Sequence, residues 1–275
     1  MKKILFLFFI LIFTFVPVFF VNAVEPIKIL LVPGHDDEIW GAQYGNLKEA
    51  DMNLRLATDI FNILKKDKKF KVFITRDKNG YTKEFSNYFT NEREKIIEFK
   101  NFAKIKTQKE ISDGSFVEKS GVPHIAASED MAIKLYGINK WANENKIDAV
   151  IHIHFNDYPR KTKWQMGKYK GFAIYIPEEQ MLNSKESTTL AKKIFTQLKK
   201  KYTISNYEKE LGGLIQDQQL IALGSKGTLN EKVKSVLIEY GYIYRFGNKI
   251  MRFKAYNNMA NATVKGIKNY FSITP

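Results

Sequence analysis

The sequence of 275 residues contains no cysteine. This absence excludes disulfides, thiolate zinc sites and cysteine nucleophiles, so any metal must be held by histidine, aspartate or glutamate. The sequence also lacks internal repeats and low-complexity linkers. The length suits one large α/β domain or two small ones, and the absence of a linker favours one.

Acidic residues are in the minority, with 29 Asp and Glu against 44 Lys and Arg, a formal net charge of +15. A basic protein suits nucleic acid, anionic lipid or an anionic polymer such as a cell wall. The sequence contains no RNP, zinc-finger or helix-turn-helix pattern, so nucleic acid is not an expected partner.

Residues 1–23 are predicted to be an export signal rather than part of the fold. Lys2 and Lys3 precede an apolar run over residues 4–21, and Val21-Asn22-Ala23 is a small-residue cleavage site. The alternative is an uncleaved membrane tether through residues 4–21, which is at the lower end of the length that spans a bilayer. Both alternatives predict that the protein functions outside the cytoplasm, in the periplasm, the cell wall or the extracellular space. The second alternative adds a membrane anchor.

The remaining residues, 24–275, alternate between apolar runs typical of strands and segments with helical periodicity. This order predicts an α/β fold in one domain: three layers, with a twisted, mainly parallel sheet of about six strands between helices. The predicted strands are 27–32, 71–77, 147–157, 171–177 and 236–242, and the predicted helices are 46–66, 131–146, 186–202 and 250–271. The last helix is expected to bury a stripe of Ile250, Phe253, Ala260, Val264, Ile267 and Phe271.

Polar residues in buried or strand-ending positions are the candidates for chemistry. His152 and His154 stand on one face near the C-terminal end of the strand at 147–157, where open α/β sheets bind ligands. His35 follows the strand at 27–32 in a Pro-Gly turn, and Glu49 begins a helix. Glu239 interrupts the apolar strand 236–242, where a carboxylate is costly without a partner. For each residue alone, an ordinary structural role is at least as reasonable.

Several short segments, in order, carry a resemblance to a known family. These are Pro33-Gly34-His35, EADMNL at 49–54, Thr75-Arg76-Asp77, IHFN at 153–156 and VLIEYG at 236–241. The sequence resembles the zinc-dependent N-acetylmuramoyl-L-alanine amidases of the Amidase_3 type, which are bacterial cell-wall enzymes. The resemblance implies peptidoglycan as substrate and cleavage of the amide bond between N-acetylmuramic acid and L-alanine.

The resemblance also implies roles for individual residues. His35, Glu49 and His154 would bind one Zn²⁺ ion, a set of two imidazoles and one carboxylate that leaves a position for water. Glu239 would be the general base and acid, which takes a proton from that water and later delivers one to the leaving amine.

The sequence departs from the family pattern in several places. Asp36 and Asp37 replace two glycines, and His152 replaces a small hydroxyl residue. We therefore predict that Asp36 or Asp37 orients His35, and that His152 supports His154 or contacts substrate. Asn156 and Arg76 lie within matching motifs and are predicted to have supporting or substrate-contacting roles.

About fifty residues, 78–128, are inserted after Asp77 where the family has a short connection. An insertion of this length predicts a lid over the zinc site or a wall of the substrate groove, and surface decoration is an equal alternative. The basic, aromatic loop 157–171, with Trp164 and Tyr169, is a candidate surface for sugar rings, although a solvated loop is equally expected.

Two other functions remain open on the sequence. PGHDDE at 33–38 echoes zinc deacetylases that act on N-acetyl sugars, with Asp37 as ligand or base; that alternative leaves the segments around Glu49 and Glu239 unexplained. A catalytically silent amidase-like module that binds peptidoglycan is the second alternative, and a buried Glu239 argues against it. The oligomeric state is not determined.

Overall fold

The computed structural model describes residues 25–272, so the predicted export signal and tether lie outside the described residues. Within the described residues, no helix is long and apolar enough to cross a membrane.

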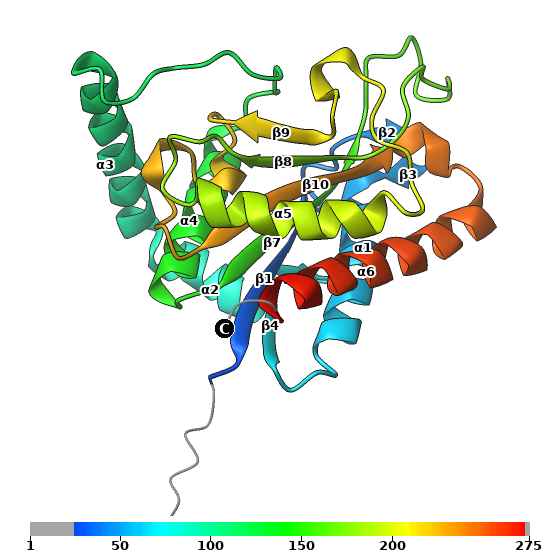
Figure 1. The fold of residues 1–275 in the computed structure, drawn as a ribbon, viewed down its shortest axis with the longest axis horizontal. Helices are drawn as coiled ribbons and strands as arrows, with labels where there is room; N and C mark the ends of the chain where they lie inside the picture. The colour runs from blue at the N-terminus through cyan, green and yellow to red at the C-terminus, as the bar shows by residue number, and fades with distance from the viewer. Residues whose placement is uncertain (1–24, 273–275) are drawn as a thin grey trace, which may run out of the picture.

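The centre of the molecule is a six-stranded sheet with the order β4-β1-β7-β10-β8-β9 (Figure 1). All neighbouring pairs are parallel except β10 and β8. The sheet strands are β1 (Ile27–Pro33), β4 (Phe70–Ile74), β7 (Ala149–Asn156), β8 (Ala173–Pro177), β9 (Leu214–Asp217) and β10 (Lys234–Tyr242). The predicted six-stranded, mainly parallel sheet is confirmed.

Two small hairpins and several 3₁₀ turns lie in the segments that connect the sheet strands and the helices. The hairpins are β2 (Gln43–Tyr44) with β3 (Leu47–Lys48), and β5 (Arg76–Asp77) with β6 (Gly80–Tyr81). The 3₁₀ turns are η1 (Glu208–Glu210), η2 (Ile221–Leu223), η3 (Ser225–Gly227) and η4 (Ile243–Phe246). The predicted strand 71–77 is therefore too long: the sheet strand ends at Ile74, and Arg76 belongs to a hairpin.

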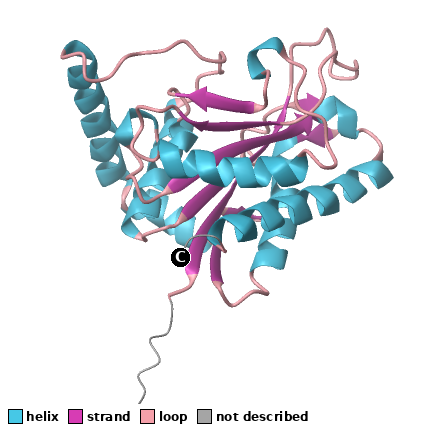
Figure 2. Cartoon of the chain, viewed as in Figure 1, coloured by secondary structure: helices cyan, strands magenta, loops and turns pink. Residues whose placement is uncertain are grey.

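Helices cover both faces of the sheet (Figure 2). They are α1 (Glu49–Leu64), α2 (Lys83–Asn91), α3 (Arg93–Ser112), α4 (Glu129–Glu144), α5 (Ser184–Leu198) and α6 (Lys249–Phe271). In β1, Ile29 and Leu31 pack into the core beneath α1, α5 and α6, while Leu30 and Val32 pack into the core beneath α2 and α4. The unbroken apolar run of β1 thus serves two faces at once, as expected of a central parallel strand.

The predicted core stripe of the last helix is partly wrong. Ile250 and Phe253 are 80% and 41% exposed, because the first turns of α6 extend beyond the sheet. The buried side chains of α6 are instead Tyr256, Met259, Ala260, Ala262, Thr263, Val264, Ile267 and Tyr270.

The insertion forms α2, α3 and a long loop over residues 113–128, here called the strap. Ile96 of α3 packs against Ile133 and Tyr136 of α4, so the helices thicken one layer. The strap returns along the β8–β9 side of the sheet, where Lys119 binds Glu178 at 2.5 Å. Val122 of the strap is buried beside Ala173 and Tyr175 of β8. The insertion is consequently ordered against the sheet.

Candidate metal centre

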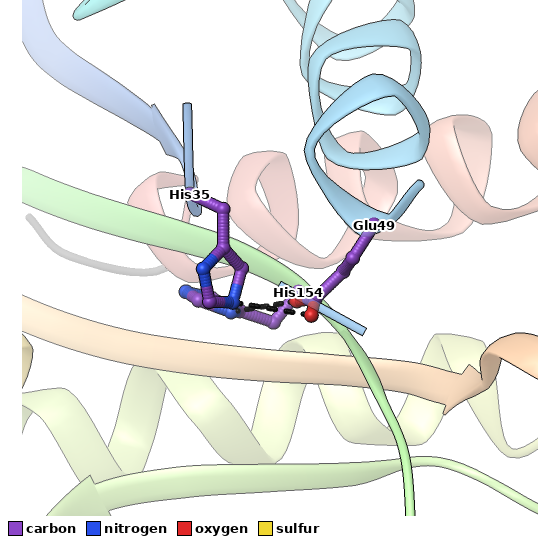
Figure 3. A group of neighbouring side chains, drawn as sticks. All are labelled: His35, Glu49 and His154. Atoms are coloured by element: carbon purple, nitrogen blue, oxygen red, sulfur yellow. Dashed lines mark hydrogen bonds and ion pairs between the residues drawn. The ribbon is translucent and has the colours of Figure 1, made fainter. Parts of the chain in front are cut away.

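Three segments that are distant in sequence bring His35, Glu49 and His154 together at the C-terminal edge of the sheet (Figure 3). The turn after β1 supplies His35, the first residue of α1 is Glu49, and β7 carries His154. Glu49 Oε2 lies 3.1 Å from His35 Nε2, and Glu49 Oε1 lies 3.0 Å from His154 Nδ1. One nitrogen or oxygen atom of each residue lies within 4.8 Å of the others, so this group can hold one metal ion.

Two glycines allow the backbone to approach these side chains. A Cβ atom on Gly34 would lie 2.1 Å from the His154 ring, and a Cβ atom on Gly41 would lie 2.4 Å from Glu49 Oε2. His35 itself has a φ of 61°, an uncommon conformation for a residue with a side chain. The tight turn explains why glycine precedes His35, since any larger residue would displace the second imidazole.

Besides the two histidines, other hydrogen-bond donors hold the Glu49 carboxylate in place. Its Oε2 accepts a hydrogen bond from the backbone N–H of Ala42 at 2.9 Å, and its Oε1 accepts from Asn53 Nδ2 at 3.2 Å and from the Phe155 backbone N–H at 3.3 Å. Its place in the first turn of α1 also favours a negative charge. These contacts fix both carboxylate oxygens toward the imidazoles.

The protonation tendencies of Glu49 and His154 suit metal binding, whereas that of His35 opposes it. Burial alone would raise the pKa of Glu49, but hydrogen bonds with His154 and His35 lower it far below its usual range. Burial lowers the pKa of His154, which favours the neutral imidazole that a metal needs. The pKa of His35 is raised, because its hydrogen bond with Glu49 and that residue's charge outweigh the effect of burial.

Arg76 supports the site from behind. Its side chain is buried and donates to three backbone carbonyls: Pro33 at 3.3 Å, Gly34 at 3.1 Å and Ala50 at 2.6 Å. The guanidinium therefore connects the His35 turn to the beginning of α1. Its part in the structure is to hold two ligand-bearing segments together, and a direct contact with substrate stays a prediction.

Asp36 and Asp37 take different positions from those expected. Asp36 is buried, and its Oδ1 accepts hydrogen bonds from the backbone N–H groups of Glu38 and Ile39 at 3.1 and 2.8 Å. These bonds hold the backbone of the turn that carries His35; they do not contact the His35 ring. Asp37 is exposed and lines, with Trp40, a neighbouring cleft of about 200 Å³.

His152 lies behind the site. It is only 1% exposed, and burial, with a smaller effect of His154, lowers its pKa to about 3. An uncharged imidazole buried to this extent cannot reach substrate from its present position. Its ring forms a hydrogen bond with the backbone of Ala222, and its Nε2 has no partner among residues 25–272, so support of His154 stays a prediction.

Glu239 extends from β10 directly beside β7, in register with His154. Its Oε2 is buried and has no hydrogen-bond partner among residues 25–272. Burial, followed by the charges of Glu49 and Glu210, raises the pKa of Glu239 well above its usual range. A half-buried carboxyl group whose pKa is raised in this way is suited to work as a general acid and base.

Glu210 is a residue of the site that sequence reasoning missed. It lies in η1, is 1% exposed, and binds Asn156, Tyr175, Ser205 and Tyr242 through its carboxylate. Its segment has neither strand nor helix periodicity, so its burial has no signal in the sequence.

The two aromatic residues predicted to contact sugar rings differ in exposure: Tyr169 is buried, whereas Trp164 is 62% exposed.

Comparison with known proteins agrees with this geometry. The model of the family described as N-acetylmuramoyl-L-alanine amidase matches residues 29–269, a range that contains all the candidate site residues. No curated protein sequence matches the chain.

Solved structures show the same fold at low sequence identity. An N-acetylmuramoyl-L-alanine amidase from Clostridium difficile 630 is 16% identical, with a TM-score of 0.54 over 92% of this chain and 100% of its own. The CwlD amidase of Clostridioides difficile, solved in complex with the GerS lipoprotein, is 16% identical with a TM-score of 0.57, over 90% of this chain and 99% of its own. The Ami1 amidase of Mycobacterium abscessus is 16% identical with a TM-score of 0.56, over 90% and 100%.

Proposed function

Because the chain belongs to the N-acetylmuramoyl-L-alanine amidase family, we propose that it hydrolyses the amide bond between N-acetylmuramic acid and L-alanine in peptidoglycan. The observation that carries this proposal is the grouping of His35, Glu49 and His154 beside Glu239, a half-buried residue with one buried, unpaired oxygen, at one sheet edge. Two imidazoles and a carboxylate are a donor set that fits a single Zn²⁺ ion with an open position.

The proposed roles follow from the contacts of each residue. When bound, zinc supplies Lewis-acid activation of water and of the amide carbonyl. Glu239 accepts a proton from the attacking water and delivers one to the nitrogen of the departing L-alanine, which leaves as an amine. Arg76 and the two glycines hold the ligands in place while the proton moves.

The strap is proposed to form one wall of the groove beside Glu239. Val122 packs beside Ala173, which is the register partner of Glu239 in β8. The ring of His124 contacts Tyr175, whose hydroxyl donates to Glu210. These contacts support the wall, and they favour it over surface decoration.

The partner and the location follow from the same proposal. Peptidoglycan is anionic and lies outside the cytoplasm, which is consistent with the basic charge and with export directed by residues 1–23. The exposed ring of Trp164, in the basic loop, is available for contact with sugar rings.

The two alternatives are less well supported. The deacetylase alternative needs Asp37 as ligand or base, yet the metal group contains Glu49 and not Asp37. A silent binding module has no use for the buried, unpaired oxygen of Glu239, which costs stability.

The test is to load the purified protein, residues 24–275, with zinc and incubate it with peptidoglycan, beside a Glu239→Gln variant. Mass spectrometry is expected to find free stem peptides that begin at L-alanine, and the variant should lose them. Release of acetate would support the deacetylase, while tight wall binding without any product would support the silent module.

A further inference from the structure

We propose that Glu210 is a positioning residue that sets the orientation of the Asn156 amide and thereby selects an amide N–H of the substrate, a role that depends on the amidase activity proposed above. The chemical group that this part of the site recognises is a hydrogen-bond donor of peptidoglycan next to the scissile bond.

The first observation is the saturation of the Glu210 carboxylate. Oε1 accepts from Asn156 Nδ2 and the Tyr175 hydroxyl, both at 2.7 Å. Oε2 accepts from the Ser205 hydroxyl at 2.5 Å and the Tyr242 hydroxyl at 3.0 Å. No Lys, Arg or His of the described chain forms an ion pair with Glu210, so neutral donors alone hold this buried group. With two donors on each oxygen, its acceptor positions are filled and no substrate group can displace them without loss.

The second observation is what this saturation does to Asn156. A carboxylate can only accept, so Asn156 must turn its NH₂ group toward Glu210. The carbonyl oxygen of Asn156 is then the free end of the amide: it has no partner among residues 25–272, and it is not one of the buried unpaired atoms. Without Glu210, the two ends of the amide would be nearly equivalent.

The third observation is the position of Asn156 relative to the metal centre. Asn156 follows His154 by two residues in β7, so both side chains leave the same face, about 7 Å apart along the strand. Across the strand pair, Glu239 is in register with His154, and Tyr242 is in register with Asn156. The fixed carbonyl therefore stands one step beyond the reacting centre.

An acceptor at this distance suits an amide N–H that flanks the scissile bond. Peptidoglycan offers two: the backbone N–H of the residue after L-alanine, and the N–H of the acetamido group of the muramic acid. Both are amide donors, so the chemistry is shared and substrate analogues separate the sources. A substrate that presents only an acceptor at this point would face the lone pairs of Asn156 and bind less tightly.

The experiment is an exchange of hydrogen-bond polarity in the zinc-loaded protein, using a soluble disaccharide-pentapeptide. Glu210→Gln turns one end of the buried group into a donor, and Asn156→Asp removes the donor that Glu210 requires. Each single variant is expected to raise KM about fivefold, the size of one lost hydrogen bond, with a smaller change in kcat. In the double variant, the new amide at 210 can donate to the new carboxylate at 156, whose other oxygen still accepts from substrate. KM should therefore return to within about twofold of wild type.

Glu208→Gln is the matched control, because Glu208 lies in the same short helix and its carboxylate binds Tyr169 rather than Asn156. This control should leave KM unchanged. Equal KM values for Glu210→Gln and Glu208→Gln would overturn the proposal, as would a double variant as impaired as the two single changes combined. A purely structural role of Glu210 predicts no rescue by the second substitution.

Substrate analogues identify the donor. The KM effect of Glu210→Gln should vanish with a substrate methylated on the peptide nitrogen after L-alanine, if that N–H is the partner, or with one lacking the muramic acetamido group, if the sugar is the partner. An effect that persists with both analogues would contradict recognition of an amide N–H. Wild-type protein without turnover would refute the amidase proposal instead. In that event the dissociation constant of the disaccharide-pentapeptide, measured by calorimetry, must follow the same pattern of loss and rescue, or the inference also fails.

Discussion

On one side of the sheet edge, Glu49 accepts hydrogen bonds from two backbone N–H groups, one amide side chain and two imidazoles. On the other side, Glu239 has a buried oxygen with no partner among the described residues. Both are glutamates, and both lie close to His154. The pKa of Glu49 is lowered and that of Glu239 is raised, although burial acts in the same direction on both.

The difference shows how one fold prepares two carboxyl groups for different work. Hydrogen-bond donors favour the charged form of Glu49, which suits its proposed role as a metal ligand, whereas burial and the negative charges of Glu49 and Glu210 favour the protonated form of Glu239. The two sides also differ in construction. The Glu49 side is built from the turn after β1 and the start of α1. The Glu239 side is built from β10, together with β8, η1 and the strap.

The largest expected effect comes from removing a metal ligand. His154→Ala should abolish zinc binding and lower kcat/KM by about 10⁴-fold or more, because a catalytic metal contributes several kcal/mol. His124→Ala is the control for zinc content only, since His124 pairs with Asp217 and lies outside the metal group. Metal content by mass spectrometry and turnover of peptidoglycan measure both. A fully active His154→Ala protein would remove the basis for the metal centre.

The next effect comes from the other carboxyl group. Glu239→Gln should lower kcat by about 10²–10⁴-fold, because the proton carrier is lost. Zinc content should remain one ion per chain, since Glu239 is outside the metal group. Loss of zinc from this variant would show that the two sides are not separate in function. Glu231→Gln, at an exposed position, should match wild type.

A smaller effect is expected from the turn that carries His35. Gly34→Ala places a methyl group 2.1 Å from the His154 ring, so the ring or the turn must shift. Zinc affinity should fall about tenfold, in the range seen when the groups that orient ligands are changed. Gly121→Ala in the strap, where the nearest atom would be 3.4 Å away, is the matched control and should bind zinc normally. Competition with a chromogenic chelator measures both affinities.

The smallest effect tests whether the strap is a firm wall on the Glu239 side. Burial alone would raise the pKa of Glu178, but hydrogen bonds led by that from Lys119 lower it to about 2. Lys119→Met should therefore lower the melting temperature at pH 7 by about 2–4 °C. Lys104→Met, in an exposed part of α3, should not.

The pH dependence of that difference has a definite sign. A carboxyl group with a lowered pKa stabilises the fold fully above its unfolded value of 4.5, and the contribution is lost as the pH falls toward 2. The difference between Lys119→Met and wild type should thus shrink as the pH is lowered from 5 toward 2. A difference that stays constant over this range would mean that the ion pair with Glu178 does not secure the strap.

The sequence by itself determined the layers of the fold and the three residues that meet in the candidate metal group. Central strands are buried on both faces, so they stand out as unbroken apolar runs, and a histidine or glutamate that interrupts or ends one is conspicuous. His35, His154 and Glu239 stood out in this way, Glu49 stood out as a carboxylate at the start of a helix, and the family motifs supplied the predicted roles of all four.

Tertiary structure alone decided which polar residues are supported by others. Glu210 lies in a segment without periodicity, and its burial depends on hydroxyl groups from β8, β10 and the loop before η1. Ile250 and Phe253 follow a helical apolar pattern, yet they are exposed because α6 begins beyond the edge of the sheet. Periodicity reports which face of an element is apolar, but only packing between distant segments decides whether that face meets a partner.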